Sequence, residues 1–229
     1  MPKEQGGSTA NSEGLSAAAI DSAVDASLER LQTDYIDLYY AHIDHRQSDL
    51  TETLEAFNAL IKRGKVRHIA CSNMMAWRVQ QAHDISEAHG WASYCGVQQR
   101  YSYLRPKPGT DFGVQEIASE ELLDYCRENE DFTLLAYSPL LGGAYTRSDR
   151  PLPDAYVSAD SEARLKVLRE VAVEVGATPN QVVIAWMLRG TPAVLPVIAA
   201  SRAEQLSEIL AAPEVKLSPE QLGRLQNAG

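Results

Sequence analysis

The chain has 229 residues, of which 45% are hydrophobic, and a formal net charge of −10 at pH 7. This length suits one large domain, residues 1–229, while the acidic balance argues against a nucleic-acid partner held by phosphate contacts. No apolar run approaches the ~20 residues of a membrane span, and the N-terminus lacks the apolar core of a signal peptide. The 3 cysteines contain no Cys-x-x-Cys pair, which fits reduced thiols in a cytoplasmic protein.

The first part of the chain predicts a helix, a buried strand and a second helix. Residues 1–14 are polar and rich in Gly and Ser, which indicates a flexible lead-in. Ser16 is a helix cap, and apolar residues follow it at helical spacing up to Leu31. Aromatic and aliphatic residues over 35–41 predict a strand that ends at His42. The next helix is expected from about Thr51 and is stopped by Gly64.

Strands and helices then alternate along the rest of the chain. Strands are predicted over 66–71, 93–98, 132–136 and 194–198. The intervening helices include one capped by Ser119, one from about 161 to 175, and one that starts at Thr178 and Pro179. Ser201 and Glu204 form a capping-box pattern that opens a further helix. Long loops are expected over 100–115 and 141–160, and loops of such length usually serve a site or are disordered.

This alternation predicts an α/β fold with a parallel sheet and helices outside it. The Gly-rich turn of doubly wound dinucleotide-binding sheets is absent, so a (β/α) barrel is the better prediction. Barrels place their chemistry at the C-terminal ends of several strands. Polar side chains follow every predicted strand here, and they are His42, Ser72 with Asn73, Gln98, Tyr137 with Ser138, and Ser201 with Arg202. Together they predict a functional polar rim.

Each member of this rim also has a structural interpretation. His42 could be a core histidine bonded to backbone, and Ser72 and Asn73 could cap the next helix. Gln98 could be an ordinary loop residue, Tyr137 a core residue, and Ser201 a cap. The functional interpretations are a proton-exchanging histidine, an amide-binding Asn–Gln pair, an aromatic face that stacks on a ring, and a phosphate site beside a helix start and Arg202. His42, Asp44 and His45 also suggest a metal site. In a strand, however, 42 and 44 share a face while 45 points away, and no further His or Glu is nearby, so no metal site is predicted.

Five blocks of the sequence resemble the aldo/keto reductase family, in the family's order. They are Ser27 to His42, Leu54 to Asn73, Val97 and Gln98 with Tyr101 and Ser102, Ala136 to Leu140, and Val197 to Leu206. The resemblance covers nearly the whole chain from Leu15 onward, and its motifs are specific. It implies a TIM barrel that binds NADPH in extended form and reduces aldehydes or ketones, small carbonyl substrates, to alcohols.

The resemblance also implies a role for each matching residue. His42 matches the histidine that orients the substrate carbonyl, and Tyr137 matches the aromatic residue that stacks on the nicotinamide. The remaining residues are implied to bind cofactor: Ser72, Asn73 and Gln98 at the carboxamide, Ser138, Pro139, Leu140 and Gly143 at the pyrophosphate, and Ser201, Arg202 and Gln205 at the adenosine 2′-phosphate.

The sequence departs from the family pattern in three places. Ala199 replaces a usual glycine, and Ile209 stands where the family has an asparagine facing the adenine. The family barrel has three strands before the strand that ends at His42, and these carry its catalytic aspartate, tyrosine and lysine. This sequence lacks a counterpart to them. We therefore expect an incomplete TIM (β/α)8-type barrel of about five strand–helix units, without the first three strands, whose exposed sheet edges favour self-association.

Two functions from different classes follow. One is an NADPH-dependent carbonyl reductase, in which a tyrosine supplies the proton. The other is a non-catalytic nucleotide-binding or interaction module, or a truncated fragment of a reductase. The missing tyrosine–lysine pair distinguishes these two functions, because without it we do not expect turnover by this chain alone.

Overall fold

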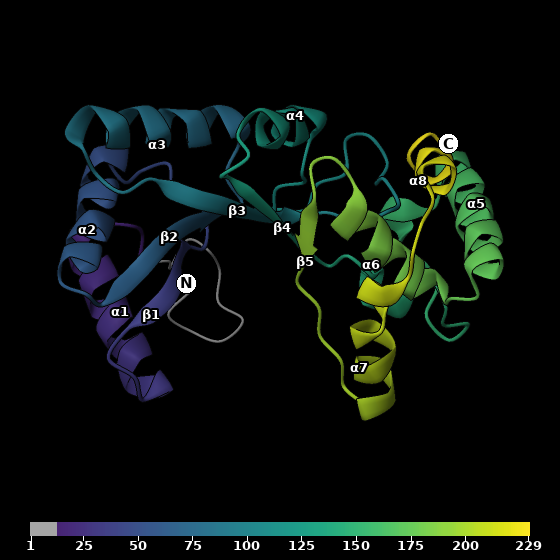
Figure 1. The fold of residues 1–229 in the computed structure, drawn as a ribbon. Coiled ribbons are helices and arrows are strands. Elements are labelled where there is room, and N and C mark those ends of the chain that lie inside the picture. Colours follow the sequence, from purple (N-terminus) through teal and green to yellow (C-terminus); the bar gives the residue numbers. More distant parts are fainter. Residues whose placement is uncertain (1–12) are drawn as a thin grey trace. The chain divides into compact units, whose positions relative to one another are not determined.

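The computed structural model describes residues 13–229, so nearly all of the predicted lead-in, 1–14, lies outside the described residues. The chain divides into two compact units (Figure 1). Unit 1 comprises Met1–Gln98 and Val114–Phe132, and unit 2 comprises Gln99–Gly113 and Thr133–Gly229. The single domain expected from the length remains a prediction.

Unit 1 holds the first strands and the helices that alternate with them. Its elements are α1 (Ala17–Leu31), β1 (Ile36–Ala41), α2 (Leu50–Lys62), β2 (Val66–Ser72), α3 (Ala76–His89), β3 (Tyr94–Arg100) and α4 (Glu120–Glu128). β1 pairs with β2 and β2 with β3, both in parallel. The register places Ala41 opposite Cys71 and Ser72 opposite Gln98, so the three strands end at the same edge.

Local sequence explains most helix boundaries in unit 1. The hydroxyls of Ser16 and Ser119 accept hydrogen bonds from the first turns of α1 and α4, as expected from the sequence. Gly90 ends α3 in the left-handed conformation, at φ +61°. α2 begins at Leu50, one residue earlier than expected, because the Asp49 carboxylate caps it by accepting from Thr51 N.

Unit 2 contains the remaining strands and helices. They are β4 (Thr133–Tyr137), α5 (Ala159–Val175), α6 (Pro179–Arg189), β5 (Val194–Pro196), α7 (Ala203–Leu210) and α8 (Pro219–Gln226). β4 and β5 pair in parallel, with Ala136 opposite Pro196. Thr178 caps α6 in a full capping box with Gln181, as the sequence indicated. All strand predictions are thereby confirmed, with ends that shift by a residue or two.

The expected loop 141–160 is more structured than the sequence indicated. It contains two short 3-10 helices, Leu141–Gly143 and Asp154–Tyr156. α5 begins at Ala159, earlier than predicted, because the Ser158 hydroxyl accepts from Ser161 N.

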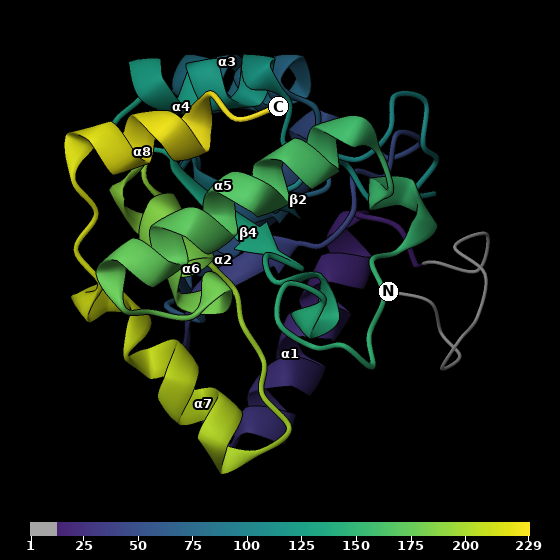
Figure 2. The same ribbon diagram turned by 90° about the vertical axis from the view of Figure 1, so that its right-hand side faces the viewer.

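Helices α5, α6 and α8 lie together on one side of unit 2 (Figure 2). Arg224 of α8 forms an ion pair with Glu174 of α5 at 2.7 Å.

Each unit has an aromatic core. In unit 1, Phe57 of α2 meets Tyr94 of β3 edge to face, with ring centroids 6.2 Å apart. In unit 2, Trp186 of α6 stacks on Tyr101 at 5.8 Å and meets Tyr103 edge to face at 5.3 Å. Such contacts add to the burial of large apolar areas, so they anchor α2 to the sheet and α6 to the segment after β3.

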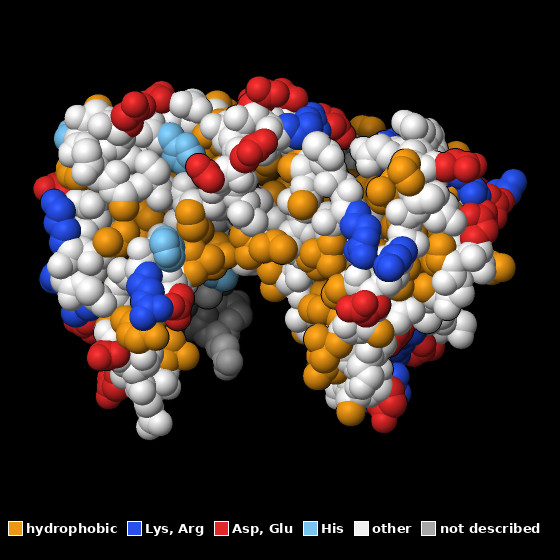
Figure 3. All heavy atoms as spheres, in the orientation of Figure 1, with side chains coloured by type: hydrophobic (Ala, Val, Ile, Leu, Met, Phe, Trp, Pro, Cys, Tyr) orange, Lys and Arg blue, Asp and Glu red, His pale blue; other side chains and the backbone are white. Residues whose placement is uncertain are grey.

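The outer surface of β5 and α7 is apolar (Figure 3). Leu195 and Val197 are 48% and 42% exposed, and Leu206 and Leu210 of α7 are also exposed. Val197 N donates to Ala136 O at 2.7 Å, directly after Pro196.

Among residues 13–229, no single helix is long and apolar enough to cross a membrane. α5 and α6 together meet this requirement of length and composition, but they are separated by a 94° bend.

His83 joins α3 to both β3 and α4, and it makes the stability of unit 1 depend on pH. Its Nε2 lies 3.0 Å from Tyr94 O and its Nδ1 lies 2.8 Å from the Tyr125 hydroxyl. Because a carbonyl only accepts, Nε2 carries the proton and Nδ1 accepts from Tyr125. Burial lowers the pKa of His83, although the bond to Tyr94 O partly opposes this effect.

We predict that the free energy of unfolding falls as the pH drops below about 6.5, the ordinary pKa of histidine. The unfolded chain binds the proton at a higher pH than the folded chain, so acid favours unfolding through this group. Urea unfolding between pH 8 and pH 5 measures the effect. His83→Gln should flatten the pH dependence, whereas His68→Gln, at an exposed histidine of β2, should leave it unchanged. Equal slopes for the parent and His83→Gln would contradict the assignment.

Candidate functional site

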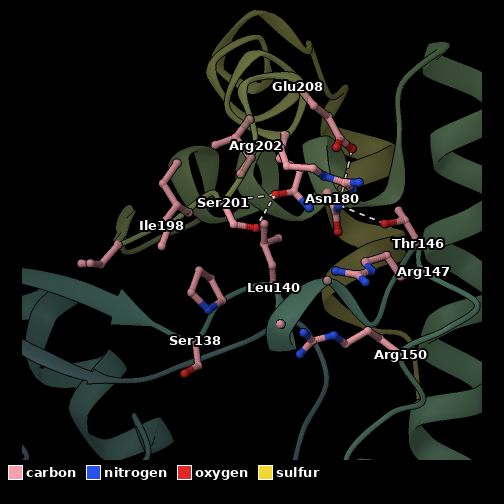
Figure 4. A pocket seen from close by; sticks show the side chains of 17 residues that line it. Ser138, Leu140, Thr146, Arg147, Arg150, Asn180, Ile198, Ser201, Arg202 and Glu208 are labelled. Atoms are coloured by element: carbon pink, nitrogen blue, oxygen red, sulfur yellow. Dashed lines mark hydrogen bonds between the residues drawn. The ribbon is translucent and has the colours of Figure 1, made fainter.

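Unit 2 contains a cavity of about 450 Å³, bounded by the segments after β4 and after β5, by α7 and by the start of α6 (Figure 4). This volume lies within the range of small-molecule sites. The cavity collects seven of the residues predicted to bind a cofactor, namely Ser138, Pro139, Leu140, Gly143, Ser201, Arg202 and Gln205. These residues come from two separate stretches of sequence, one after β4 and one after β5. The parallel pairing of β4 with β5 brings the two stretches together.

The N-terminus of α7 forms one wall of this cavity. Its N-cap is Arg202 in an extended conformation, and no side chain caps it. The predicted capping box of Ser201 and Glu204 is therefore wrong. The reason is that Gln205 Oε1 accepts from both the backbone N–H and the hydroxyl of Ser201, each at 3.2 Å, so the hydroxyl acts as a donor instead.

An uncapped helix start can bind an anion. Helix N-termini carry a partial positive charge and N–H groups that point outward. Arg202 adds a full charge at the same place, and Ser201, whose hydroxyl donates to Gln205, lines the cavity beside it. Arg147 and Arg150, on the segment after β4, also line the cavity. Arg147 Nε donates to the Asp149 carboxylate at 3.0 Å, and this hydrogen bonding, with the charge of Asp149, raises the pKa of the guanidinium.

The segment after β4 reaches the cavity by way of residues with a left-handed backbone conformation. Ser138 follows β4 with φ +56°, and Leu141 has φ +49°. Left-handed conformations are costly for such residues and cluster at functional sites. Here they turn the chain directly from the strand into the 3-10 helix Leu141–Gly143 that lines the cavity. Tyr137, the last residue of β4, is half-buried rather than part of the core.

In unit 1, the strand ends form a hydrogen-bonded polar cluster around Asn73. Its Nδ2 donates to His42 O at 3.1 Å and to Ser72 Oγ at 3.0 Å, and its Oδ1 accepts from Glu116 N at 3.1 Å. Its backbone N–H donates to Gln98 O at 3.1 Å. The structure thus brings together four predicted site residues: His42, Ser72, Asn73 and Gln98.

The structure contradicts several of the structural interpretations of these residues. Ser72 and Asn73 do not cap α3, because its N-cap is Met75 and no side chain bonds there. Gln98 lies within β3 rather than in a loop. His42 is exposed at the end of β1 rather than buried in the core, and partial burial lowers its pKa. A largely neutral, accessible imidazole at neutral pH can donate a hydrogen bond to a carbonyl oxygen.

The sequence missed several residues of the cavity. Thr146, Arg147, Arg150, Asn180 and Glu208 all line it. Thr146, Arg147 and Arg150 lie in a loop, where the sequence has no periodic pattern. Asn180 lies in a helix whose pattern of apolar residues indicates a core position. Within residues 13–229, no three His, Cys, Asp or Glu side chains are grouped so that they could hold a metal ion.

Comparison with known proteins identifies the family. The model of the aldo/keto reductase family matches residues 6–229. The chain belongs to the aldo/keto reductase family. It is 29% identical to versiconal hemiacetal acetate reductase of Aspergillus parasiticus, over 98% of this chain and 66% of that protein. It is 28% identical to norsolorinic acid reductase stcV of Emericella nidulans, over 95% of this chain and 54% of that protein.

A solved structure supports the same assignment. A thermostable aldo-keto reductase in complex with the inhibitor epalrestat superposes with a TM-score of 0.75 at 30% identity, covering 94% of this chain and 68% of that one. The fold is therefore α/β of the TIM-barrel type, represented here by five parallel strands. The chain spans less than two thirds of the length of the two curated relatives.

We predict that Asn73 stabilises unit 1 through both its side chain and its backbone. Asn73 has φ +53°, a conformation that asparagine and glycine tolerate best. Asn73→Ala removes its side-chain bonds and places at positive φ a residue that tolerates this conformation less well than asparagine, so the free energy of unfolding should fall by about 2–4 kcal/mol. Asn73→Gly loses the same bonds without the left-handed penalty and should be more stable than Asn73→Ala by about 1 kcal/mol. Urea titrations that gave both variants equal stability would refute the backbone contribution.

Proposed function

We propose that this chain is the cofactor-binding part of an NADPH-dependent reductase that converts aldehydes or ketones to alcohols. The observation that carries the proposal is the cavity of unit 2, where an uncapped helix start, Ser201, Arg202 and Gln205 lie together. The donors of this set suit a phosphate monoester, the group that distinguishes NADPH from NADH. Ser138, Pro139, Leu140 and Gly143 would line the path of the pyrophosphate.

The polar cluster of unit 1 has groups that suit the nicotinamide end and the substrate. Asn73 already uses its amide within the protein, so it would act mainly by holding Ser72 and the His42 backbone in place. Gln98 would hydrogen-bond the carboxamide, and Ser72 Oγ, whose hydrogen is donated to Gln98 O at 2.8 Å, would accept from its amide nitrogen. When bound, the reduced nicotinamide supplies a hydride. His42 would orient the carbonyl by donating a hydrogen bond to its oxygen.

Reduction also needs a proton at the alkoxide oxygen. The Tyr40 side chain hydrogen-bonds that of Gln98, but burial raises its pKa above the ordinary value. A general acid works best when its pKa lies near the working pH, so Tyr40 is a poor donor. This observation favours the second candidate function, a nucleotide-binding module whose catalysis by these residues alone is slow.

We predict that Arg202→Ala weakens NADPH binding by about 10- to 100-fold, because charge-assisted hydrogen bonds to the phosphate are lost. NADH binding should change by less than about 2-fold, since NADH lacks that phosphate. Quenching of tryptophan fluorescence measures both affinities. Arg169→Ala, which removes the same charge from an exposed position of α5 outside the cavity, is the matched control. An equal loss for both cofactors would count against a 2′-phosphate site.

We predict that residues 1–229 bind NADPH but reduce a generic aldehyde slowly. General-acid catalysis is typically worth about 10²–10⁴-fold, and Tyr40 is not tuned to supply it. The decrease in NADPH absorbance measures turnover, and a chain extended at its N-terminus to include the family's tyrosine and lysine provides the comparison. Tyr40→Phe should leave the slow rate within about 2-fold, which matches a poor acid. Fast turnover that Tyr40→Phe abolishes would show that Tyr40 is the acid after all.

A further inference from the structure

Asp44 lies two residues beyond His42, and its buried carboxylate has no part in the proposed reaction. The sequence groups Asp44 with two histidines, which suggests a metal site, but the structure pairs it with cations instead. Its side chain is 6% exposed and forms ion pairs with Arg46 of the same loop and with Arg78 of α3, where Oδ1 lies 3.5 Å from Nε. A buried carboxylate needs partners of this kind, because it has lost its hydration.

The Asp44 carboxylate lies close to the sheet of unit 1. Burial raises the pKa of the Cys71 thiol in β2, and the negative charge of Asp44 adds to this effect. Burial is also the main cause of the raised pKa of the Tyr94 hydroxyl in β3, to which Asp44 contributes in the same direction. Charges act strongly on each other only where little water separates them. The carboxylate is therefore an interior group of unit 1 that lies near both the sheet and α3.

Two side-chain contacts fasten the loop after β1 to the first turn of α3. Arg78 is the third residue of α3, and its side chain is 13% exposed. Its Nη1 donates to Gln81 Oε1 at 2.9 Å, which orients the guanidinium. Arg46 reaches from the loop in the opposite direction, with its guanidinium 4.8 Å from the centre of the Trp77 ring. A cation over an aromatic face adds to the attraction of the ion pair, so residues 44 and 46 are both held to α3.

These contacts restrict the backbone that carries His42. On one side of it, Ala41 pairs with Cys71 in the register of β1 and β2. His42 O accepts a hydrogen bond from Asn73 Nδ2 at 3.1 Å. On the other side, the Asp44 ion pairs hold the loop. Because the attraction between buried charges must offset their lost hydration, such a pair holds its residues in a defined geometry. The backbone of His42 is thus fixed from both directions.

We propose that Asp44 and Arg78 are positioning residues, which hold the loop after β1 so that the His42 imidazole faces the substrate carbonyl. The inference rests on the proposed function, in which His42 donates a hydrogen bond to that oxygen. A displacement of a catalytic group by about 1 Å can lower a rate by about 10²-fold. The ion pair should therefore affect the rate of reduction more than the affinity for NADPH, because the pair lies in unit 1 and the cavity proposed to bind the phosphates lies in unit 2.

Backbone mobility tests the inference in the full chain. In the parent, ¹⁵N order parameters of residues 42–46 should be about 0.85, the value of rigid backbone, and in Asp44→Asn and Arg78→Gln they should fall below about 0.6. Asp37→Asn is the matched control, because Asp37 of β1 forms an exposed ion pair with Arg67 at 2.7 Å and its substitution removes the same charge. Order that both test variants retain would overturn the inference.

Rates and affinities show whether the lost order matters for reduction. At saturating NADPH, reduction of a generic aldehyde should be at least about 10-fold slower in Asp44→Asn and Arg78→Gln than in the parent, whereas the dissociation constant for NADPH should stay within about 2-fold. Arg78→Lys keeps the charge and should recover most of the rate. The N-terminally extended chain carries the same substitutions where the parent rate is too low to compare. An unchanged rate in variants with a mobile loop would overturn the inference and leave the reductase proposal standing.

The double variant Asp44→Asn/Arg78→Gln carries the test if a single variant does not fold, as judged by circular dichroism. It leaves neither charge of the pair buried without its partner. If the two residues act as a pair, its rate should lie within about 2-fold of that of each single variant, and a product of two separate losses would overturn the pairing. If neither the parent nor the extended chain oxidises NADPH, the reductase proposal is rejected, and the positioning role is rejected with it.

Discussion

The parallel register of β1, β2 and β3 is the constraint on which the polar cluster of unit 1 depends. Ser72 lies opposite Gln98, and Ala41 lies opposite Cys71. The ends of the three strands therefore lie at the same edge of the sheet. A slip by one residue would turn every side chain of the displaced strand to the other face of the sheet. Asn73 secures this alignment from outside the ladder, because it bonds the backbone of His42 on one side and of Gln98 on the other. The geometry of the cluster is therefore a property of the sheet.

The helices of unit 2 differ in how their first turns are stabilised. Side chains cap α5, α6 and α8, whereas the first turn of α7 has no side-chain cap. A side-chain cap is worth about 0.5–2 kcal/mol to a helix. The Ser201 hydroxyl could supply one, yet Gln205 holds it in another direction. A bound anion at the same N–H groups would restore that stabilisation, so binding and local order of α7 should be coupled.

The sequence predicted the strands and most helix starts because their signals are local. Ser16, Ser119 and Thr178 each cap the helix that follows, and each acts over three residues or fewer. The errors occur where a distant or competing partner decides. Ser201 satisfies the capping-box pattern, but Gln205 competes for its hydroxyl. Asn73 could cap α3 by its position in the sequence, but its amide bonds to His42, directly after β1, and to Glu116, before α4.

The cavity could be predicted only in part, for the same reason. Residues next to strand ends, such as Ser138 and Arg202, could be placed from the order of the elements. Asn180 could not, because its burial within α6 follows the helical pattern of a core residue. Its contacts with Thr146 and Glu208 join residues 34 and 28 positions away. That no described residue donates to its oxygen can be recognised only when the packing of all three segments is known.

Pro196 has a further consequence for how β5 behaves in solution. N–H groups of successive strand residues point to opposite sides, and Val197 N–H points to β4. The position of Pro196 therefore faces the other side, where proline has no hydrogen to donate. An incoming strand would meet the apolar side chains of Leu195 and Val197 but would lack a bond in the middle of the ladder. Pro196 therefore discourages fibril-like growth by strand addition, while the apolar surface beside it can still pack against other side chains.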